Sequence, residues 1–365
     1  MKLQKLTSLS IGLLIWAGGA LLMAQQAPDT ILFNGKVVTM NEHGVNGNIG
    51  TTAQAIAVRG DRIVAVGNNA EIRGLAGPST KSVDLKGRTV LPGMGVTHDH
   101  PMDWDPLNPY IVKKAVSDDA HIERFLQDPP DQQLQQFPRI LEEAVQKAKS
   151  GQWIRISMLY GKEYRWGRQI QQMMGRQITK EMLDRAAPNN PVLVRAGFVG
   201  ILLNKKAIET VNEHYAGVKG SNDPHWGLLD ENVQRTGIGS VNYRGVEQDV
   251  LYPPNIYREI VRLGASWWAG YGLTANSSAI YTAGAMNAYS ELDRTGQMDI
   301  RIPWSWIGPP SGLLHQPLFH GGNECHGRKG IGLLLDDWSV AGGHGDGLHI
   351  PGGHIPGGES PGADL

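Results

Sequence analysis

The order of strand-like and helix-like patterns along the chain constrains the fold most. Up to residue 91 the chain consists of short runs with β propensity, separated by the turn-favouring pairs Asn34-Gly35, Gly60-Asp61 and Lys86-Gly87. The runs are residues 31–40, 55–59, 62–66, 82–85 and 88–91. After residue 115, amphipathic helical segments alternate with apolar strand-like segments, which is typical of α/β folds with parallel strands. We therefore expect a small antiparallel β-sandwich part over residues 28–88, followed by an α/β region.

The alternating region predicts specific elements. Strands are expected at residues 153–159, 191–195, 272–274 and 300–306. Helices are expected at residues 136–149, 180–187, 254–269 and 285–295. Thr179 is expected to cap the second of these helices, because its hydroxyl can accept a hydrogen bond from a free amide of the first turn.

Composition excludes several classes of protein. The formal net charge of the 365-residue chain is −1, which gives no electrostatic basis for binding nucleic acid or an anionic membrane. The chain has one cysteine, Cys325, so neither an intrachain disulfide nor a zinc ribbon held by several cysteines can form. Any bound metal must be held by histidines and carboxylates.

The N-terminus has the pattern of a secretory signal. Lys2 and Lys5 precede the mostly apolar stretch 8–23, and the small residue Ala24 follows. The alternative is a membrane anchor, but the apolar run is shorter than the roughly 20 residues that span a bilayer. We expect residues 1–24 to be a cleaved signal peptide, leaving no stable membrane span, and the mature protein to be periplasmic or secreted.

The C-terminus has a different composition. Residues 342–365 are dominated by Gly, Pro and His and contain the repeated pentapeptide His-Ile-Pro-Gly-Gly, beginning at His349 and His354. A segment of this kind buries too little apolar surface to order itself. We expect it to be a disordered tail.

Two histidines follow the last strand of the first region. The segment Val90-Leu-Pro-Gly-Met-Gly-Val leads through Thr97 to His98-Asp99-His100. Residues two apart in an extended strand point to the same face, so both imidazoles can reach one metal ion. Neutral imidazole suits zinc and other transition metals. The alternative is that two histidines fall close together by chance.

These residues resemble the amidohydrolase superfamily, in particular its YtcJ-like or amidohydrolase 3 branch. Members carry a Leu-Pro-Gly segment that leads to His-x-His at the end of the first barrel strand. Further similar segments follow in the same order as in the family, namely Leu183-Asp184 with Ala186-Ala187-Pro188, Leu203-Asn204, Gly227 to Glu231, Gly272-Leu273-Thr274 and Met298 to Ile302.

The resemblance implies a (β/α)8 TIM-like barrel, incomplete here and spanning residues 89–341, with a metal at the C-terminal ends of its strands. It implies hydrolysis of amide or other non-peptide C–N bonds of a small-molecule substrate by a metal-activated water. His98 and His100 would be ligands of a divalent metal, with zinc favoured.

The sequence departs from the family in two ways. Val96 stands where members carry an aspartate two residues before the first histidine, which removes a possible hydrogen-bond partner of the ligands. The later strands that supply further histidines and the catalytic aspartate are not recognisable. We therefore expect a truncated chain that is inactive alone, and a compensating homo-oligomer, because a partial barrel leaves an unpaired edge.

Other residues are weaker candidates. Asp99 should point away from the metal and be structural, and Asp103 and Asp105 should lie in a loop, more simply solvated than facing substrate. Trp267 and Trp268, like Trp304 and Trp306, form either core or a pocket wall, and core is the simpler interpretation. Candidates with less support are Asp336 and Asp337 after an apolar run, Lys329, and the histidines His315, His320, His326, His344, His349 and His354.

Two alternatives to a hydrolase stay open. One is a non-catalytic periplasmic binding or scaffold protein derived from an amidohydrolase. The other is a protein that binds metal through its histidine-rich tail, although a flexible segment preorganises a site poorly. The substrate cannot be read from the sequence, because specificity lies in the loops rather than in the fold.

Overall fold

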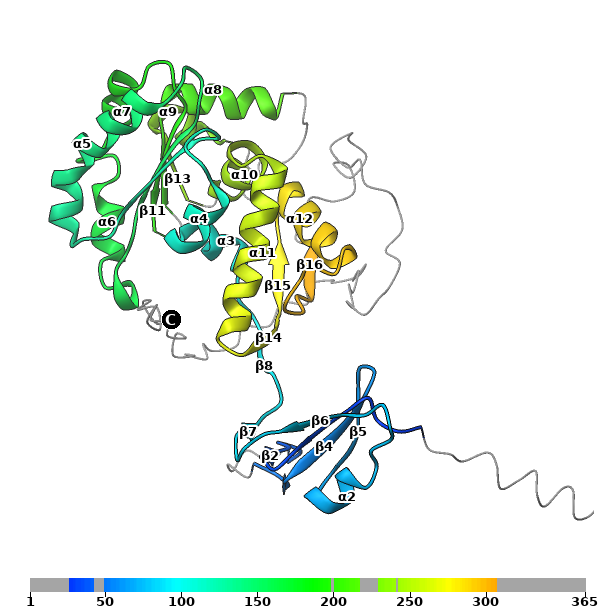
Figure 1. Ribbon diagram of the computed structural model, residues 1–365. Coiled ribbons are helices and arrows are strands. Elements are labelled where there is room, and N and C mark those ends of the chain that lie inside the picture. The colour runs from blue at the N-terminus through cyan, green and yellow to red at the C-terminus, as the bar shows by residue number, and fades with distance from the viewer. Residues whose placement is uncertain (1–25, 43–48, 198–199, 217–228, 241, 307–365) are drawn as a thin grey trace, which may run out of the picture. The chain divides into compact units, whose positions relative to one another are not determined.

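The computed structural model of the protein describes residues 26–42, 49–197, 200–216, 229–240 and 242–306 (Figure 1). These residues form a mixed α/β structure, as expected. The chain divides at Gly93 into two compact units. The first unit has a small apolar core and the second has two larger ones.

The first unit consists of short strands and one helix. Its elements are β1 (Thr30–Phe33), β2 (Lys36–Val38), β3 (Thr52–Ala53), β4 (Ala55–Arg59), β5 (Arg62–Gly67), α2 (Asn69–Arg73), β6 (Lys81–Asp84) and β7 (Thr89–Val90). They form a four-stranded sheet in the order β5-β4-β1-β6 and a three-stranded sheet in the order β3-β2-β7. Ile31, Ala55, Ala57 and Ile72 form the core.

The turns of this unit are where the sequence places them. Gly60, with φ +56°, connects β4 to β5 as an antiparallel hairpin. Asn34, with φ +59°, separates β1 from β2. The expectation of a purely antiparallel sheet is wrong, because β1 pairs with β6, and β2 with β7, in parallel. The sandwich arrangement of the two sheets stays a prediction.

A five-stranded sheet forms the first half of the second unit. Its strands are β9 (Ile122–Leu126), β10 (Ile154–Met158), β11 (Val192–Ala196), β12 (Gly200–Leu203) and β13 (Ile238–Gly239), in the order β13-β12-β11-β10-β9. β9, β10 and β11 are parallel, as expected. β12 pairs antiparallel with both β11 and β13, so it runs against the direction of the other four strands.

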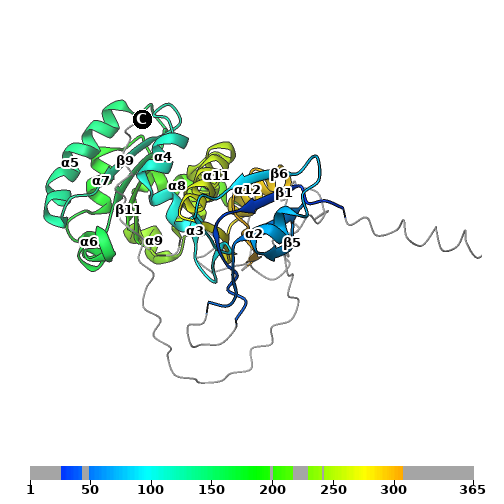
Figure 2. The same ribbon diagram turned by 60° about the horizontal axis from the view of Figure 1, so that its bottom comes forward.

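Helices cover both faces of this sheet. The helices of the second unit, in chain order, are α3 (Pro101–Trp104), η1 (Asp105–Leu107), α4 (Pro109–Ala115), α5 (Pro130–Lys147), η2 (Lys162–Tyr164), α6 (Gly167–Met173), α7 (Lys180–Ala186), α8 (Lys205–His214), α9 (Glu231–Thr236), α10 (Tyr243–Gly245), the π-helix η4 (Val246–Leu251), α11 (Pro254–Gly270) and α12 (Ala283–Arg294). Figures 1 and 2 show α5, α6 and α7 along one side of the sheet and α11 on the other. Thr179 caps α7 as expected, accepting a hydrogen bond from the amide of Met182.

A separate set of parallel strands carries the histidine motif. β8 (Met94–Val96) pairs in parallel with β14 (Leu273–Asn276), and β15 (Ser278–Ile280) pairs in parallel with β16 (Trp304–Trp306). β14 and β15 follow each other directly, so this double segment lies between β8 and β16. The barrel expected from the sequence, and its limits at residues 89 and 341, stay predictions.

Several sequence expectations lie outside the described residues. They concern the signal at residues 1–24, the tail at residues 342–365, and the candidates Cys325, Lys329, Asp336, Asp337 and the six histidines from His315 onward. Within the described ranges, no helix is long and apolar enough to cross a membrane.

Candidate functional site

His98 and His100 lie immediately after β8, at its carboxyl end. The segment is held to the neighbouring strand by two backbone hydrogen bonds, from the amide of Ser277 to the carbonyl of Val96 and from the amide of Asp99 to the carbonyl of Ser277. The two Nε2 atoms are 3.1 Å apart, with the rings edge to face. The histidines expected to share a site therefore do converge, although the strand itself ends at Val96.

The distance between these nitrogens fits a shared metal ligation. Two zinc–nitrogen bonds of about 2.0–2.1 Å at a tetrahedral angle place their nitrogens about 3.3 Å apart. Burial lowers the pKa of His100, so its imidazole is neutral at pH 7, which is the form that ligates metal. A hydrogen bond between the two rings accounts for the same distance, so the distance alone does not distinguish a metal pair from a hydrogen-bonded pair.

Other features of a complete metal site are not found in the described part of the chain. No group of three or more His, Cys, Asp or Glu residues is placed there to hold a metal ion. Nδ1 of His100 is buried and has no hydrogen-bond partner among the described residues. Metal-ligating histidines usually donate from this second nitrogen, and Val96, two residues before His98, has an apolar side chain that offers no acceptor. Among the described residues, the two histidines converge without a third candidate ligand beside them.

Asp99, which lies between the two histidines, stabilises the backbone of the motif. One oxygen, Oδ1, accepts hydrogen bonds from the backbone amide of His100 at 2.8 Å and from Nε1 of Trp104 at 3.0 Å. It therefore ties the second histidine to the last residue of α3. This geometry agrees with the structural role expected for Asp99.

Asp103 is buried, and the expectation of a solvated loop is wrong for it. Its carboxylate faces the guanidinium of Arg244, with Oδ2 2.8 Å from Nη2 and both oxygens 3.2 Å from Nε. The guanidinium also lies 4.2 Å above the ring of Tyr281, and that ring is 5.9 Å from the imidazole of His100. Arg244 and Tyr281 therefore form one side of the histidine site.

The same expectation is wrong for Asp105, which is also buried. Its Oδ1 accepts a hydrogen bond from Nε1 of Trp268 at 3.2 Å, and its carboxyl packs against Gly264 of α11. Burial raises the pKa of Asp105 well above its usual range. Asp105 connects η1 to α11 and is not aimed at the histidines. Trp267 and Trp304 are partly buried and pack against the core, and Trp268 is also partly buried.

A buried ion cluster, which no sequence motif indicates, lies behind the site. On the sheet face that carries Arg155 and Arg195, Nε of Arg155 donates to Glu247 at 2.8 Å, and its Nη1 lies 3.2 Å from Glu123. Arg195 approaches the other oxygen of Glu247 at 3.6 Å. Nη1 of Arg155 also donates to the carbonyl of Pro106. The cluster fixes η4 to the sheet and to the segment that follows the histidines.

η4 in turn contacts the site from behind. Nε2 of Gln248 donates to the carbonyl of Met102 at 3.3 Å, and the hydroxyl of Thr282 donates to its Oε1 at 2.6 Å. Thr282 follows Tyr281 directly. π-helical turns are frequent at functional sites, and η4 contacts the segment that follows the histidines. Arg244 and Gln248 are far from the histidines in sequence and carry no motif, so sequence analysis could not find them.

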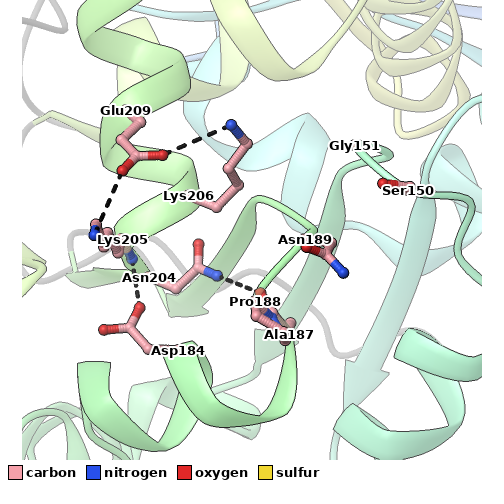
Figure 3. A pocket seen from close by; sticks show the side chains of 10 residues that line it. All are labelled: Ser150, Gly151, Asp184, Ala187, Pro188, Asn189, Asn204, Lys205, Lys206 and Glu209. Atoms are coloured by element: carbon pink, nitrogen blue, oxygen red, sulfur yellow. Dashed lines mark hydrogen bonds and ion pairs between the residues drawn. The ribbon is translucent and has the colours of Figure 1, made fainter.

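A separate surface hollow of about 550 Å³ lies at the start of α8 (Figure 3). Its polar groups are engaged in local structure. Oδ1 of Asn204 caps the helix at the amide of Ala207, Asp184 accepts from the amide of Lys205, and Lys206 pairs with Glu209. None of the candidate site residues predicted from the sequence lines this hollow.

Comparison with known proteins gives a limited set of similarities. No protein-family model matches the sequence. The chain is 25% identical to N-substituted formamide deformylase from Arthrobacter pascens over 287 residues, which are 76% of this chain and 47% of that enzyme. It is 28% identical over 158 residues to Protein LONG AFTER FAR-RED 3 from Arabidopsis thaliana, covering 43% of this chain and 23% of that protein.

Among solved structures, an uncharacterized metal-dependent hydrolase from Pyrococcus horikoshii OT3 matches 76% of this chain and 48% of its own, with a TM-score of 0.49 and 17% identity. The chain spans about half the length of this hydrolase and of the deformylase. The hydrolase activity expected from the sequence agrees with the name of the deformylase, and for this chain it stays a prediction. The branch named from the motifs stays a prediction.

Proposed function

We propose that this protein is a metal-dependent hydrolase of the amidohydrolase type that cleaves an amide or related non-peptide C–N bond of a small molecule. The observation that carries the proposal is the 3.1 Å approach of the His98 and His100 Nε2 atoms at the end of a parallel strand. The deformylase similarity supports it, since that relative is named for N-substituted formamides. Hydrolysis of such a compound would give formate and an amine.

The metal would be held by His98 and His100 together with ligands beyond those described. A divalent metal, with zinc proposed, supplies charge that polarises a carbonyl and acidifies water. The protein's own residues prepare the site: Asp99 fixes the backbone of His100, and Tyr281 covers one side of its ring. His98 is exposed and therefore reachable by substrate. We also propose a periplasmic or secreted location.

Metal titration of the full chain tests the proposal. We expect zinc to bind, and His100→Ala to weaken its affinity at least about tenfold, because the loss of a hydrogen-bond partner of a ligand already costs about 10–100-fold. His349→Ala, a change in the histidine-rich tail, should leave this affinity unchanged. Equal affinity in wild type and His100→Ala would contradict the proposal, and a loss in His349→Ala alone would favour metal binding by the tail.

Release of formate from N-substituted formamides tests the reaction. Turnover that disappears in both His98→Ala and His100→Ala would support the hydrolase. Zinc binding without turnover is the result expected if this chain lacks part of its catalytic site. Tight binding of an amide without any dependence on metal would favour the non-catalytic binding protein.

A further inference from the structure

The turn between β10 and α6 has an unusual backbone. Glu163 (φ +57°, ψ +28°) and Tyr164 (φ +54°) are consecutive non-glycine residues in the left-handed region. Each such residue is disfavoured, because its Cβ crowds the backbone, and a pair in succession is uncommon. Strain of this kind persists only where the surrounding structure imposes it, and it clusters at binding sites.

The surroundings of the turn do impose it. Gly161, with φ +73°, lies so close to the ring of Trp166 that a Cβ there would be 2.5 Å from it. The amide of Trp166 donates to the carbonyl of Tyr160 at 3.0 Å, which closes the turn. The hydroxyl of Tyr160 donates to the carbonyl of Ala196 at 2.6 Å, which anchors the turn to the end of β11.

The turn places Tyr164 beside the histidine motif. Its ring centroid lies 5.5 Å from that of Trp104, whose indole donates to Asp99, the residue between the two histidines. Tyr164 is 43% exposed, close to the 49% of the surface tyrosine Tyr110. The strained turn therefore holds an aromatic pair at the site with one side accessible, rather than burying its tyrosine in the core.

We propose that Tyr164 and Trp104 form an apolar wall of the substrate site, which binds an aryl or comparable planar apolar group of a neutral amide-type substrate. This inference rests on the proposed function. Aromatic faces stack on planar apolar groups. The carboxylate of Asp99, which accepts a hydrogen bond from the indole of Trp104, disfavours a negatively charged group next to this pair.

The phenol of Tyr164 suits this role. Burial, with a contribution from the charge of Asp99, raises the pKa of Tyr164 to about 12. The ring therefore carries no charge at neutral pH.

Two amides that differ only in the nitrogen substituent test the wall. Binding of acetanilide and of N-methylacetamide to the zinc-loaded full chain is measured by NMR titration. We expect acetanilide to bind more tightly in wild type. Tyr164→Gly should weaken acetanilide binding about fivefold to tenfold, the size of an aromatic pair contribution, and change N-methylacetamide binding less than about twofold. Glycine adopts the left-handed backbone without strain, so this variant should fold.

Two variants serve as controls. Tyr164→Phe keeps the ring and should retain the preference for acetanilide. Tyr110→Ala removes a tyrosine of similar exposure whose ring centroid lies 5.0 Å from that of Trp267 in a tilted arrangement, and should leave both affinities unchanged.

The proposed wall would be contradicted by an unchanged ratio of the two affinities in Tyr164→Gly, or by a wild type that does not prefer acetanilide. Zinc affinity of the same proteins separates this proposal from the proposed function. If His100→Ala does not change the zinc affinity but Tyr164→Gly changes the ratio of the amide affinities, the proposed metal site is wrong and the proposed aromatic wall is supported. If His100→Ala weakens zinc binding but Tyr164→Gly does not change the ratio, the metal site is supported and the aromatic wall is wrong.

Discussion

Asp103 and Asp105 are two positions apart and both are buried, yet their carboxyls are accommodated differently. Asp103 is matched by the guanidinium of Arg244 at 2.8 Å. Asp105 has a single neutral donor, Nε1 of Trp268, and no cation pairs with it among the described residues. A buried carboxylate without a cation is costly, and the group responds by holding its proton.

We predict that Asp105→Asn stabilises the protein at high pH. Burial raises the pKa of Asp105 in the folded protein. Below about pH 4 the carboxyl is neutral in the folded and the unfolded chain, so it does not reduce the free energy of unfolding. As the pH rises from there toward the folded pKa, the unfolded chain releases this proton and the free energy of unfolding falls. Asparagine keeps the acceptor for Trp268 and cannot ionise. We therefore expect Asp105→Asn to be more stable than the wild type at pH 8 and to differ less from it at pH 4.

Urea unfolding at the two pH values measures this difference. Asp119→Asn, a change at a carboxyl with 92% side-chain exposure, is the control and should alter stability by less than about 0.5 kcal/mol at both. A uniform loss of stability in Asp105→Asn at both pH values would show that the carboxyl is satisfied as an anion.

At the scale of elements, α11 packs closely on the segment that follows the histidines. Gly264 lies in the helix interior, and a Cβ built there would be 2.0 Å from Oδ2 of Asp105. Glycine is disfavoured inside helices. Here its lack of a side chain is what lets the helix approach η1.

We therefore predict opposite effects for two glycines of the same helix. Gly264→Ala should destabilise the protein by about 1–3 kcal/mol, the usual cost of overpacking, although alanine has the higher helix propensity. Gly270→Ala, at the last position of α11 with nothing within 4 Å of its Cβ, should be neutral or slightly stabilising. Thermal unfolding of both variants gives the comparison. Asp105→Ala should rescue part of the loss in Gly264→Ala, and additivity of the two changes would contradict the clash.

The elements themselves were largely predictable, because local patterns determine them. Gly60 and Thr179 act as the turn and cap that their residue types indicate, and the helix expected at residues 254–269 is α11, Pro254–Gly270. The pairing of elements was less predictable. The reversal of β12, and the pairing of β8 with β14 nearly 180 residues later, depend on packing that no local pattern encodes.

The same difference between local patterns and long-range packing applies to the candidate site. His98 and His100 were found because they are adjacent and follow a strand. Arg244 pairs with Asp103, which lies 141 positions earlier in the sequence. Tyr164 contacts Trp104 because of a strained turn, and no glycine stands at the strained positions to indicate that turn in the sequence. Contacts of this kind arise only in the folded chain.

For the whole molecule, two carboxyls, one buried and one partly buried, act in opposite directions on stability as pH changes. Glu123 is buried, but Arg155 and His121 lower its pKa, so it contributes stability that is lost as the solution becomes acidic. Asp249 behaves in the opposite way, because burial raises its pKa to about 6. It accepts hydrogen bonds from the amide of Gly284 and from the hydroxyl of Tyr215, and so joins η4 to the start of α12 and the end of α8.

Asp249 should give the chain a decline in stability between pH 4 and pH 6. In that range the folded protein keeps a proton that the unfolded chain releases from a group with a pKa of 3.8, so stability falls as pH rises and becomes constant above pH 6. The change is on the order of 3 kcal/mol. It is isolated as the difference in unfolding free energy between wild type and Asp249→Asn, measured in urea from pH 4 to pH 7.5. Glu123 and other carboxyls cancel from this difference when they are unaffected by the substitution. Asp293→Asn, at an exposed position of α12, should change stability by less than about 0.5 kcal/mol throughout. A difference for Asp249→Asn that does not vary with pH would mean that Asp249 is ionised in the folded protein across the whole range.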